Sequence, residues 1–514
     1  MIRPLGRSLA AAAATTVAVA TPAAAEWREA SSDHFIVYAD SSESWLRNFA
    51  GRLERYDAAL RLVRPVPEID GLKSNRVVVY AVPSVEAVQK LCGRCGAVAG
   101  FYVPRVGGSV AFSARSGGDT ARDISADVVL FHEYAHHYML SKTEYAYPRW
   151  MTEGFAEFHA TAKVDRDGDI DIGRPANHRA YNLINTRMPV TKVFDPPTKL
   201  DLQTQDQFYG RAWALYHMLT FDPARKSQLS TYLAAINNGK PGLVAAREAF
   251  GDLAALDKDL NAYIGRPIKF VPIKAAELKT GPIAVRTLNA AEAGMMLVRM
   301  QSDRGLNRAA ALALIPEARR RAAAFPNDPA VQNALAEAEY DAGNDAEAEA
   351  AVDRVLAANP GDPQALLYKG RVLTRRAATA KIRDAKVWRE ARSWFLKANK
   401  ADTDAAMPFV LFYRSFREQG IAPTPSAIAG LERAFELSPQ DRGLRWNVAQ
   451  QYLADGKMAL ARRTLLPLAY DPHGGDQAGF AARLIAAIDA GEAGAKLARE
   501  RPTAAAAEGA APTD

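Results

Sequence analysis

Residues 132–136 have the sequence His-Glu-Tyr-Ala-His, and residues 153–157 have the sequence Glu-Gly-Phe-Ala-Glu. On a helix, His132 and His136 lie one turn apart on one face, so both imidazoles can reach one tetrahedral metal ion. Glu133 lies about 100° further round the helix, where its carboxylate can contact a water beside the metal without becoming a ligand. The first stretch therefore predicts a metal site with a general base next to it.

Both stretches lie in segments with helical patterning. Residues 125–140 are expected to form one helix, and Pro148 can begin a second helix that carries the glutamates. On this second helix, Glu153 and Glu157 are again one turn apart. Glu153 can supply a third ligand, and Glu157 can accept a hydrogen bond from the far nitrogen of a ligand histidine.

This pattern resembles the gluzincin zinc metallopeptidases of the thermolysin and aminopeptidase type, and more closely their bacterial peptidase MA-like branch. The matching residues are His-Glu-x-x-His at 132–136 and Trp-Met-Thr-Glu-Gly-Phe-Ala-Glu at 150–157. In the family, the glutamate before Gly-Phe-Ala is the third zinc ligand, which corresponds to Glu153. An acidic residue four positions later orients a zinc histidine, which corresponds to Glu157, although thermolysin itself has an aspartate there. The resemblance covers roughly residues 30–280.

The resemblance implies hydrolysis of a peptide or protein substrate at a Zn²⁺ ion held by His132, His136 and Glu153. Glu133 would be the general base, moving a proton from water to the leaving amine. In the family, a tyrosine on a later helix stabilises the oxyanion, and Tyr209, followed by Arg-Ala-Trp-Ala-Leu, occupies the matching place.

Other interpretations of these residues stay open. Tyr216 and His217, on the same predicted helix, are alternatives to Tyr209, and tyrosines in such helices are mostly core residues. The family's aminopeptidases carry an upstream glutamate that binds the substrate amine, whereas residues 107–111 contain no carboxylate, which argues against aminopeptidase action. The histidine and glutamate pairs could also form plain ion pairs. The alternative function is a catalytically inactive scaffold whose repeats mediate protein–protein interaction.

The segment ahead of the metal helix mixes strands and helices. The expected elements are strands at 34–39, 76–82, 100–103 and 108–112 and a helix at 44–63. The fold class predicted for residues 26–285 is therefore α+β, and the resemblance implies a gluzincin-like metallopeptidase fold, with residues 268–285 as an extended connector. In the resembled family, the last strand before the metal helix is an exposed edge that binds extended substrate. Residues 107–113 are the candidate, and a buried strand is the alternative.

From about residue 290 an internal repeat of about 34 residues begins. Ala-Phe-Pro-Asn-Asp-Pro at 324–329 recurs as Ala-Asn-Pro-Gly-Asp-Pro at 358–363, and weaker copies follow near 398, 437 and 470. This resembles a tetratricopeptide array, which predicts an all-α solenoid at 286–493 and a concave surface for a protein partner. A spacer or a dimerisation element is the alternative. The Ala-rich residues 494–514 are expected to be disordered.

The first residues have the pattern of an export signal. Arg3 and Arg7 precede a small apolar stretch, and Ala-Ala-Ala at 23–25 offers cleavage after Ala25. A periplasmic or secreted location is expected, without a transmembrane anchor after signal cleavage.

Length, charge and cysteine content limit the number of domains and the kind of partner. A chain of 514 residues is too long for one hydrophobic core. The formal net charge of +7 is spread without a basic block, which argues against nucleic acid as a partner. The two cysteines, Cys92 and Cys95, are expected to form a short disulfide in an oxidising compartment. A redox dithiol and half of a metal site are the alternatives.

Overall fold

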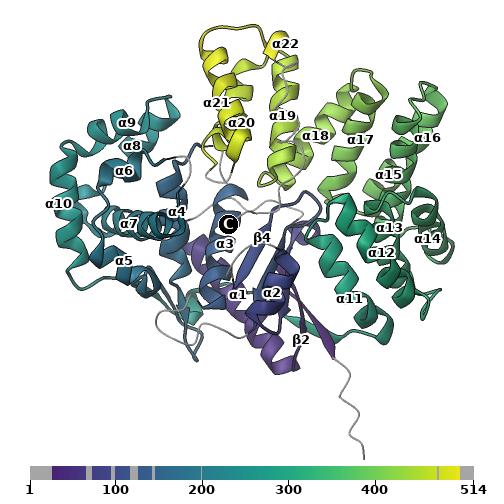
Figure 1. Ribbon diagram of the computed structural model, residues 1–514, viewed down its shortest axis with the longest axis horizontal. Coiled ribbons are helices and arrows are strands. Elements are labelled where there is room, and N and C mark those ends of the chain that lie inside the picture. The colour runs from purple at the N-terminus through teal and green to yellow at the C-terminus, as the bar shows by residue number, and fades with distance from the viewer. Residues whose placement is uncertain are drawn as a thin grey trace, which may run out of the picture.

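The computed structural model describes residues 26–64, 72–93, 99–115, 125–141, 145–197, 200–471 and 474–497. Its N-terminal part combines a sheet with helices, and its C-terminal part is helical throughout the described residues (Figure 1). This confirms a mixed α+β region followed by an all-helical one. Among the described helices, none is long and apolar enough to cross a membrane.

The main sheet has the strand order β4-β5-β3-β2-β1-β9, and a smaller sheet has the order β6-β7-β8. The strands are β1 (Trp27–Ser31), β2 (Phe35–Asp40), β3 (Val77–Val82), β4 (Gly100–Val103), β5 (Val110–Ala114), β6 (Lys163–Val164), β7 (Ile170–Ile172), β8 (Val271–Ile273) and β9 (Ala284–Thr287). The β2, β3 and β5 strands run parallel, and β4, β1 and β9 pair antiparallel with their neighbours.

The helices of the N-terminal part surround this sheet and extend to one side of it (Figure 1). They are α1 (Glu43–Val63), α2 (Val85–Cys92), α3 (Ala126–Ser141), α4 (Arg149–Ala160), α5 (Ala180–Asn185), α6 (Val190–Phe194), α7 (Leu202–Phe221), α8 (Gln228–Asn237), α9 (Gly242–Phe250) and α10 (Leu253–Ile264).

The C-terminal helices follow one another as antiparallel pairs. They are α11 (Ala290–Asp303), α12 (Arg308–Ala322), α13 (Pro329–Asp341), α14 (Asp345–Ala358), α15 (Pro363–Thr379), α16 (Ala385–Ala401), α17 (Ala406–Gln419), α18 (Pro425–Leu437), α19 (Arg442–Ala454), α20 (Met458–Ala469), α21 (Gly475–Asp489) and α22 (Gly494–Leu497).

Alternating side chains of the main sheet pack against different helices on its two faces, as strand geometry requires. On one face, Val37 and Val79 share a core with α1 and α3. On the other, Tyr80 shares a core with α2 and with Met296 and Met300 of α11. The first helix of the C-terminal part therefore covers the second face of the N-terminal sheet.

The prediction that residues 107–113 form an exposed edge is wrong. The β5 strand lies between β4 and β3, and all five of its residues are buried. The terminal strand is β4, which pairs back onto β5 across the predicted turn. A strand covered on both faces lacks the alternation of an edge, and Val-Ala-Phe-Ser-Ala lacks it.

The predicted connector at residues 268–285 is not a connector. It contains β8, which completes the small sheet, and the start of β9, which closes the far edge of the main sheet against β1. The chain therefore stays within the N-terminal region up to Thr287.

The repeat signature falls at turns between helix pairs. The side chains of Asp328 and Asp362 cap α13 and α15, each followed by proline at the first helical position. The copy near residue 398 instead lies in the last turn of α16. At the C-terminus, α22 lies inside the segment predicted to be disordered, and its Leu497 is buried. Residues 498–514 and the predicted signal, 1–25, lie outside the described residues.

Candidate metal centre

The α3 helix, which carries the candidate ligands His132 and His136, is held in place by α1. Tyr134 donates a hydrogen bond to Asp57 (2.7 Å), and Tyr138 donates one to the carbonyl of Arg64 (2.8 Å). In return, Tyr56 of α1 donates to a backbone carbonyl of α3 (2.9 Å). These bonds fix the rotation of α3 about its axis, which decides where its histidines point.

The second helix, α4, lies unusually close to α7 because of Gly154. A Cβ atom at this position would lie 2.6 Å from the carbonyl oxygen of Ala212 and 3.0 Å from Cβ of Tyr216. Glycine is therefore required between the two glutamates for the helices to approach this closely. The close packing leaves Glu153 and Glu157 fully buried between the helices.

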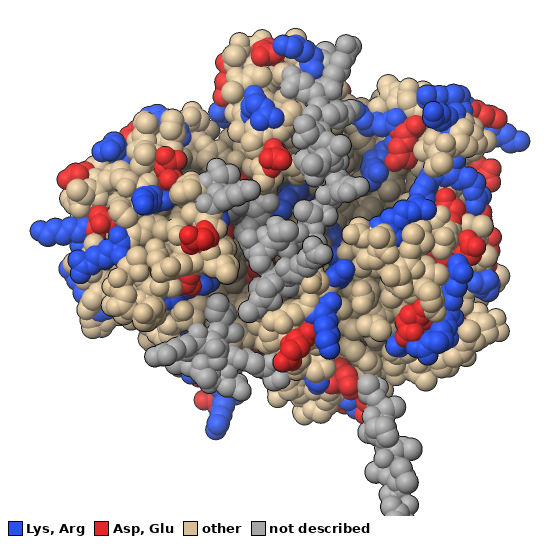
Figure 2. All heavy atoms as spheres, viewed as in Figure 1, with Lys and Arg blue, Asp and Glu red and all other residues tan. Residues whose placement is uncertain are grey.

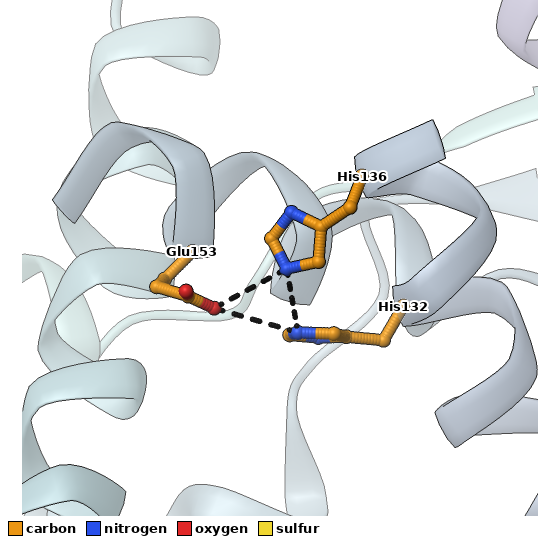
Figure 3. A group of neighbouring side chains, drawn as sticks. All are labelled: His132, His136 and Glu153. Carbon is orange, nitrogen blue, oxygen red and sulfur yellow. Dashed lines mark hydrogen bonds and ion pairs between the residues drawn. The ribbon is translucent and has the colours of Figure 1, made fainter. Parts of the chain in front are cut away.

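The structure brings His132, His136 and Glu153 together (Figure 3). The Nε2 atoms of the two histidines lie 3.1 Å apart. Oε2 of Glu153 lies 3.4 Å from Nε2 of His132 and 3.5 Å from Nε2 of His136. The three atoms thus form a nearly equilateral triangle whose donors face one another.

This triangle has the dimensions that a tetrahedral zinc site needs. With bonds of about 2.0–2.1 Å, two ligands of a tetrahedral ion lie roughly 3.3–3.4 Å apart. Two imidazole nitrogens and one carboxylate are also a donor set that zinc accepts at sites with an open position. The geometry and the chemistry of the three residues therefore fit a divalent ion such as Zn²⁺.

Glu157 contacts the ring nitrogen of His132 that faces away from Glu153. Its Oε1 atom lies 3.3 Å from Nδ1 of His132, the ring atom opposite the nitrogen that faces Glu153. It also pairs with Arg179 (2.7 Å) and His178 (2.9 Å). Burial alone would raise the pKa of Glu157, but Arg179 and the two histidines hold it well below its usual range.

The two carboxylates beside His132 favour its protonated form. Burial alone would lower the pKa of His132, but its ion pairs with Glu153 and Glu157 outweigh burial and raise the pKa to about 10. A metal ion would take the place of that proton, since a ligand histidine must be neutral.

His178 and Arg179 were missed by reasoning from the sequence. They lie in a 3-10 turn (Asn177–Arg179) beside α5, far from either motif in the chain. Arg179 also pairs with Asp206 of α7 (2.5 Å). The only available signal was indirect: a fully buried carboxylate such as Glu157 requires a cation nearby.

Tyr209 lies against the site. Its ring stacks on the ring of His132, with the centroids 6.0 Å apart, and the guanidinium of Arg179 lies 5.2 Å from its centroid. Its hydroxyl accepts a hydrogen bond from Gln205 (3.2 Å). Glu133 follows His132 on α3 and is partly exposed.

The two alternatives to Tyr209 lie elsewhere. Tyr216 is buried against Arg64, which donates a hydrogen bond to its hydroxyl. His217 is bonded to the hydroxyl of Tyr263 (2.7 Å) and to two backbone carbonyls. Both side chains hold structural positions in the core.

A second cluster joins His34 to two carboxylates. Nδ1 of His34 lies 2.8 Å from Glu54 and 3.4 Å from Asp57. Arg61 already pairs with Asp57 at 2.5 Å, so the cluster has its own cation. These ion pairs raise the pKa of His34 against the effect of burial. We interpret the cluster as a structural ion network behind α3.

The predicted disulfide is only half described. Cys92 ends α2 and does not have a free thiol. Cys95 lies outside the described residues, so its pairing with Cys92 stays a prediction.

Comparison with known proteins finds a family match in one segment of the helical part. No curated protein matches the chain. Residues 329–372, which span α13, α14 and much of α15, match the tetratricopeptide repeat family. The predicted repeats are thus confirmed for this segment, and such repeats suggest interaction with a protein partner.

Proposed function

We propose that the protein is a zinc-dependent peptidase of the gluzincin type whose helical repeats bind a substrate or a partner protein. The observation that carries this proposal is the triangle of donor atoms of His132, His136 and Glu153, with edges of 3.1, 3.4 and 3.5 Å. It is supported by Glu133 next to one ligand and by Glu157 behind it.

Each residue would have a distinct task. His132, His136 and Glu153 would hold Zn²⁺, which polarises a carbonyl and makes water more acidic when bound. Glu133 would take a proton from the attacking water and deliver it to the leaving amine. Tyr209 would donate a hydrogen bond to the developing oxyanion. Glu157 would keep the ring of His132 in the ligand orientation.

The test combines metal analysis with cleavage of an unfolded protein. Wild type should contain one zinc ion per chain, and Glu153→Ala should lose it. Glu133→Gln should keep the zinc but lose about 10²–10⁴ in turnover, because only proton transfer is removed. A Glu133→Gln variant as active as wild type would rule out this mechanism.

A scaffold without catalysis is the second candidate, and the tetratricopeptide match at residues 329–372 favours it. In this case the metal would stabilise the fold and the repeats would carry the function. Zinc at full occupancy without cleavage of a broad peptide library would support the scaffold.

We also propose that the protein is exported, on the basis of the signal pattern in residues 1–25.

The surface charges are mixed. On the face shown in Figure 2, acidic and basic side chains are interspersed among the described residues.

A further inference from the structure

The C-terminal helices are attached to the hairpin beside the metal helix. Val106, in the turn between β4 and β5, is buried in a core formed by α17, α18 and α19. The carbonyl of Val106 accepts a hydrogen bond from Ser438, and Ser109 accepts one from Gln440 (both 3.4 Å). Asn75, ahead of β3, donates a hydrogen bond to the carbonyl of Asp404 (3.0 Å).

A second attachment lies on the helical side of the N-terminal part. Leu466 of α20 is buried in the N-terminal core, and Tyr470 packs against the same core. Arg462 donates a hydrogen bond to the carbonyl of Asn237 at the end of α8 (3.3 Å). Besides the packing of α11 on the sheet, the described residues therefore fix the later repeats at two separate places.

At each attachment, the N-terminal segment that contacts the repeats also contacts one of the two helices that carry the candidate ligands, or the residues just before it. On the hairpin side, the hydroxyl of Tyr102 in β4 lies 2.6 Å from Nδ1 of His137 in α3. On the other side, Asn237 bonds both backbone groups of Ala146, just before α4, at 2.8 and 3.2 Å. The two attachments thus flank the pair of helices that carries the metal ligands.

The span between the two attachments is formed by α19 and α20. Figure 1 shows α20 and α19 above α3 and β4 in this view. Burial raises the pKa of Tyr102, and the charges of Glu133 and of Asp441 and Arg442, at the start of α19, have smaller effects on the same pKa. The start of α19 and Glu133 therefore both lie within electrostatic range of Tyr102.

We propose that α19 and α20 bridge the metal centre, so that the substrate is an extended, unfolded polypeptide segment and folded domains are kept from the zinc. This inference rests on the proposed peptidase function and adds the substrate class. The repeats are a fixed wall of the site, held by buried apolar side chains on both sides.

The bridge would discriminate between substrates by their width. Neighbouring strands lie only about 4.8 Å apart, so an extended segment that pairs with β4 takes up little space beside it. A folded domain of 100 residues has a radius of gyration of about 13 Å and cannot approach without lifting the bridge.

The experiment uses one cleavable peptide in three forms with the full-length, zinc-loaded protein. The peptide is free, or is placed between two folded carrier domains with either long or short flexible spacers. Two variants detach the bridge at one attachment each, Val106→Asp and Leu466→Asp. Leu396→Asp is the matched control, because Leu396 is 55% exposed on the same solenoid.

Wild type and the control should cut the short-spacer form at least about tenfold more slowly than the long-spacer form, because a short spacer cannot span the bridge. Both detached variants should cut the long-spacer and short-spacer forms at rates within about twofold of each other. Cleavage of the free peptide by each variant checks that the variant is folded. If a detached variant fails to fold, Val106→Ala and Leu466→Ala should change the ratio in the same direction.

Equal rates on both spacer forms in wild type would overturn the inference, as would an unchanged ratio in all attachment variants. Binding of the three forms to Glu133→Gln, measured by fluorescence anisotropy, repeats the comparison without turnover. If wild type cuts nothing but this binding still depends on spacer length, the peptidase function fails while the bridge stands. Binding that ignores spacer length overturns the bridge.

Discussion

Nδ1 of His132 lies 3.3 Å from Oε1 of Glu157, on the side of the ring opposite the Nε2 atom that faces Glu153. One imidazole therefore joins the two glutamates of the Glu-Gly-Phe-Ala-Glu stretch. Because α4 supplies both carboxylates that contact His132, the orientation of its ring depends on how α4 is packed.

Glu157→Gln should weaken zinc binding by about 10–100-fold, because the ring of His132 loses the carboxylate charge that orients it and makes it more basic. Competition with a coloured zinc chelator measures this affinity. Glu43→Gln, at a glutamate that is 59% exposed, should leave it unchanged. Equal affinities for the two variants would show that Glu157 does not support the ligand.

Arg179→Leu should reduce the free energy of unfolding of the metal-free protein by about 3 kcal/mol, because it leaves the buried Glu157 without its main cation. Urea unfolding measures the loss. The exposed pair of Arg414 and Glu418 is the control, since Arg414→Leu should cost only about 0.5 kcal/mol. A similar cost for both would mean that the pair at Glu157 is no stronger than a surface one.

Tyr209→Phe should lower turnover by about 10²–10³-fold while zinc content stays the same, because it removes one donor to the oxyanion. Steady-state kinetics with metal analysis gives both quantities. Tyr181→Phe, at a tyrosine that is 76% exposed, should behave like wild type. Full activity of Tyr209→Phe would leave Tyr209 as a packing residue only.

The stability of the protein should fall as the pH falls below about 6.5, partly because of His159. Burial lowers the pKa of His159 to about 3, so the unfolded chain gains a proton that the folded chain does not. Between pH 7.5 and 5.5, this residue should cost about 1.4 kcal/mol. Urea unfolding at both pH values measures this cost. Between pH 7.5 and 5.5, His159→Asn should lose about 1.4 kcal/mol less stability than wild type. An identical loss in both would refute this assignment.

Gly154→Ala should destabilise the protein by about 1–3 kcal/mol, because the added methyl group would overlap the backbone of Ala212. It should also weaken zinc binding, since α4 must move and carries Glu153 with it. Gly479→Ala is the control: Gly479 lies in α21 with open space beside it, so alanine should be neutral or stabilising. Thermal unfolding with and without zinc measures both effects.

Much of the candidate site could be predicted from the sequence, because its contacts are set by helical spacing. One turn of helix separates His132 from His136 and Glu153 from Glu157, so only the packing of two consecutive helices had to be assumed. His178 and Arg179 had no such periodicity, and only their distance in space from Glu157 gives them a role.

Strands could be predicted where the sequence has a clear apolar pattern. They could not be predicted where a strand forms only by pairing with a segment far away in the chain. The β2 and β3 strands have clear apolar patterns. In contrast, β9 is mostly exposed and is a strand only because β1, more than two hundred residues earlier, pairs with it. The edge strand was misassigned because β5 is buried on both faces, a property that depends on α2 and α3 as well as on the strand itself.

The position of α11 has a practical consequence for cutting the chain into pieces. A fragment that ends at residue 285 would lack Met296 and Met300, and the aromatic surface around Tyr80 and Phe112 would face water. Such a fragment should aggregate when expressed, whereas one that continues through Asp303 keeps the sheet covered.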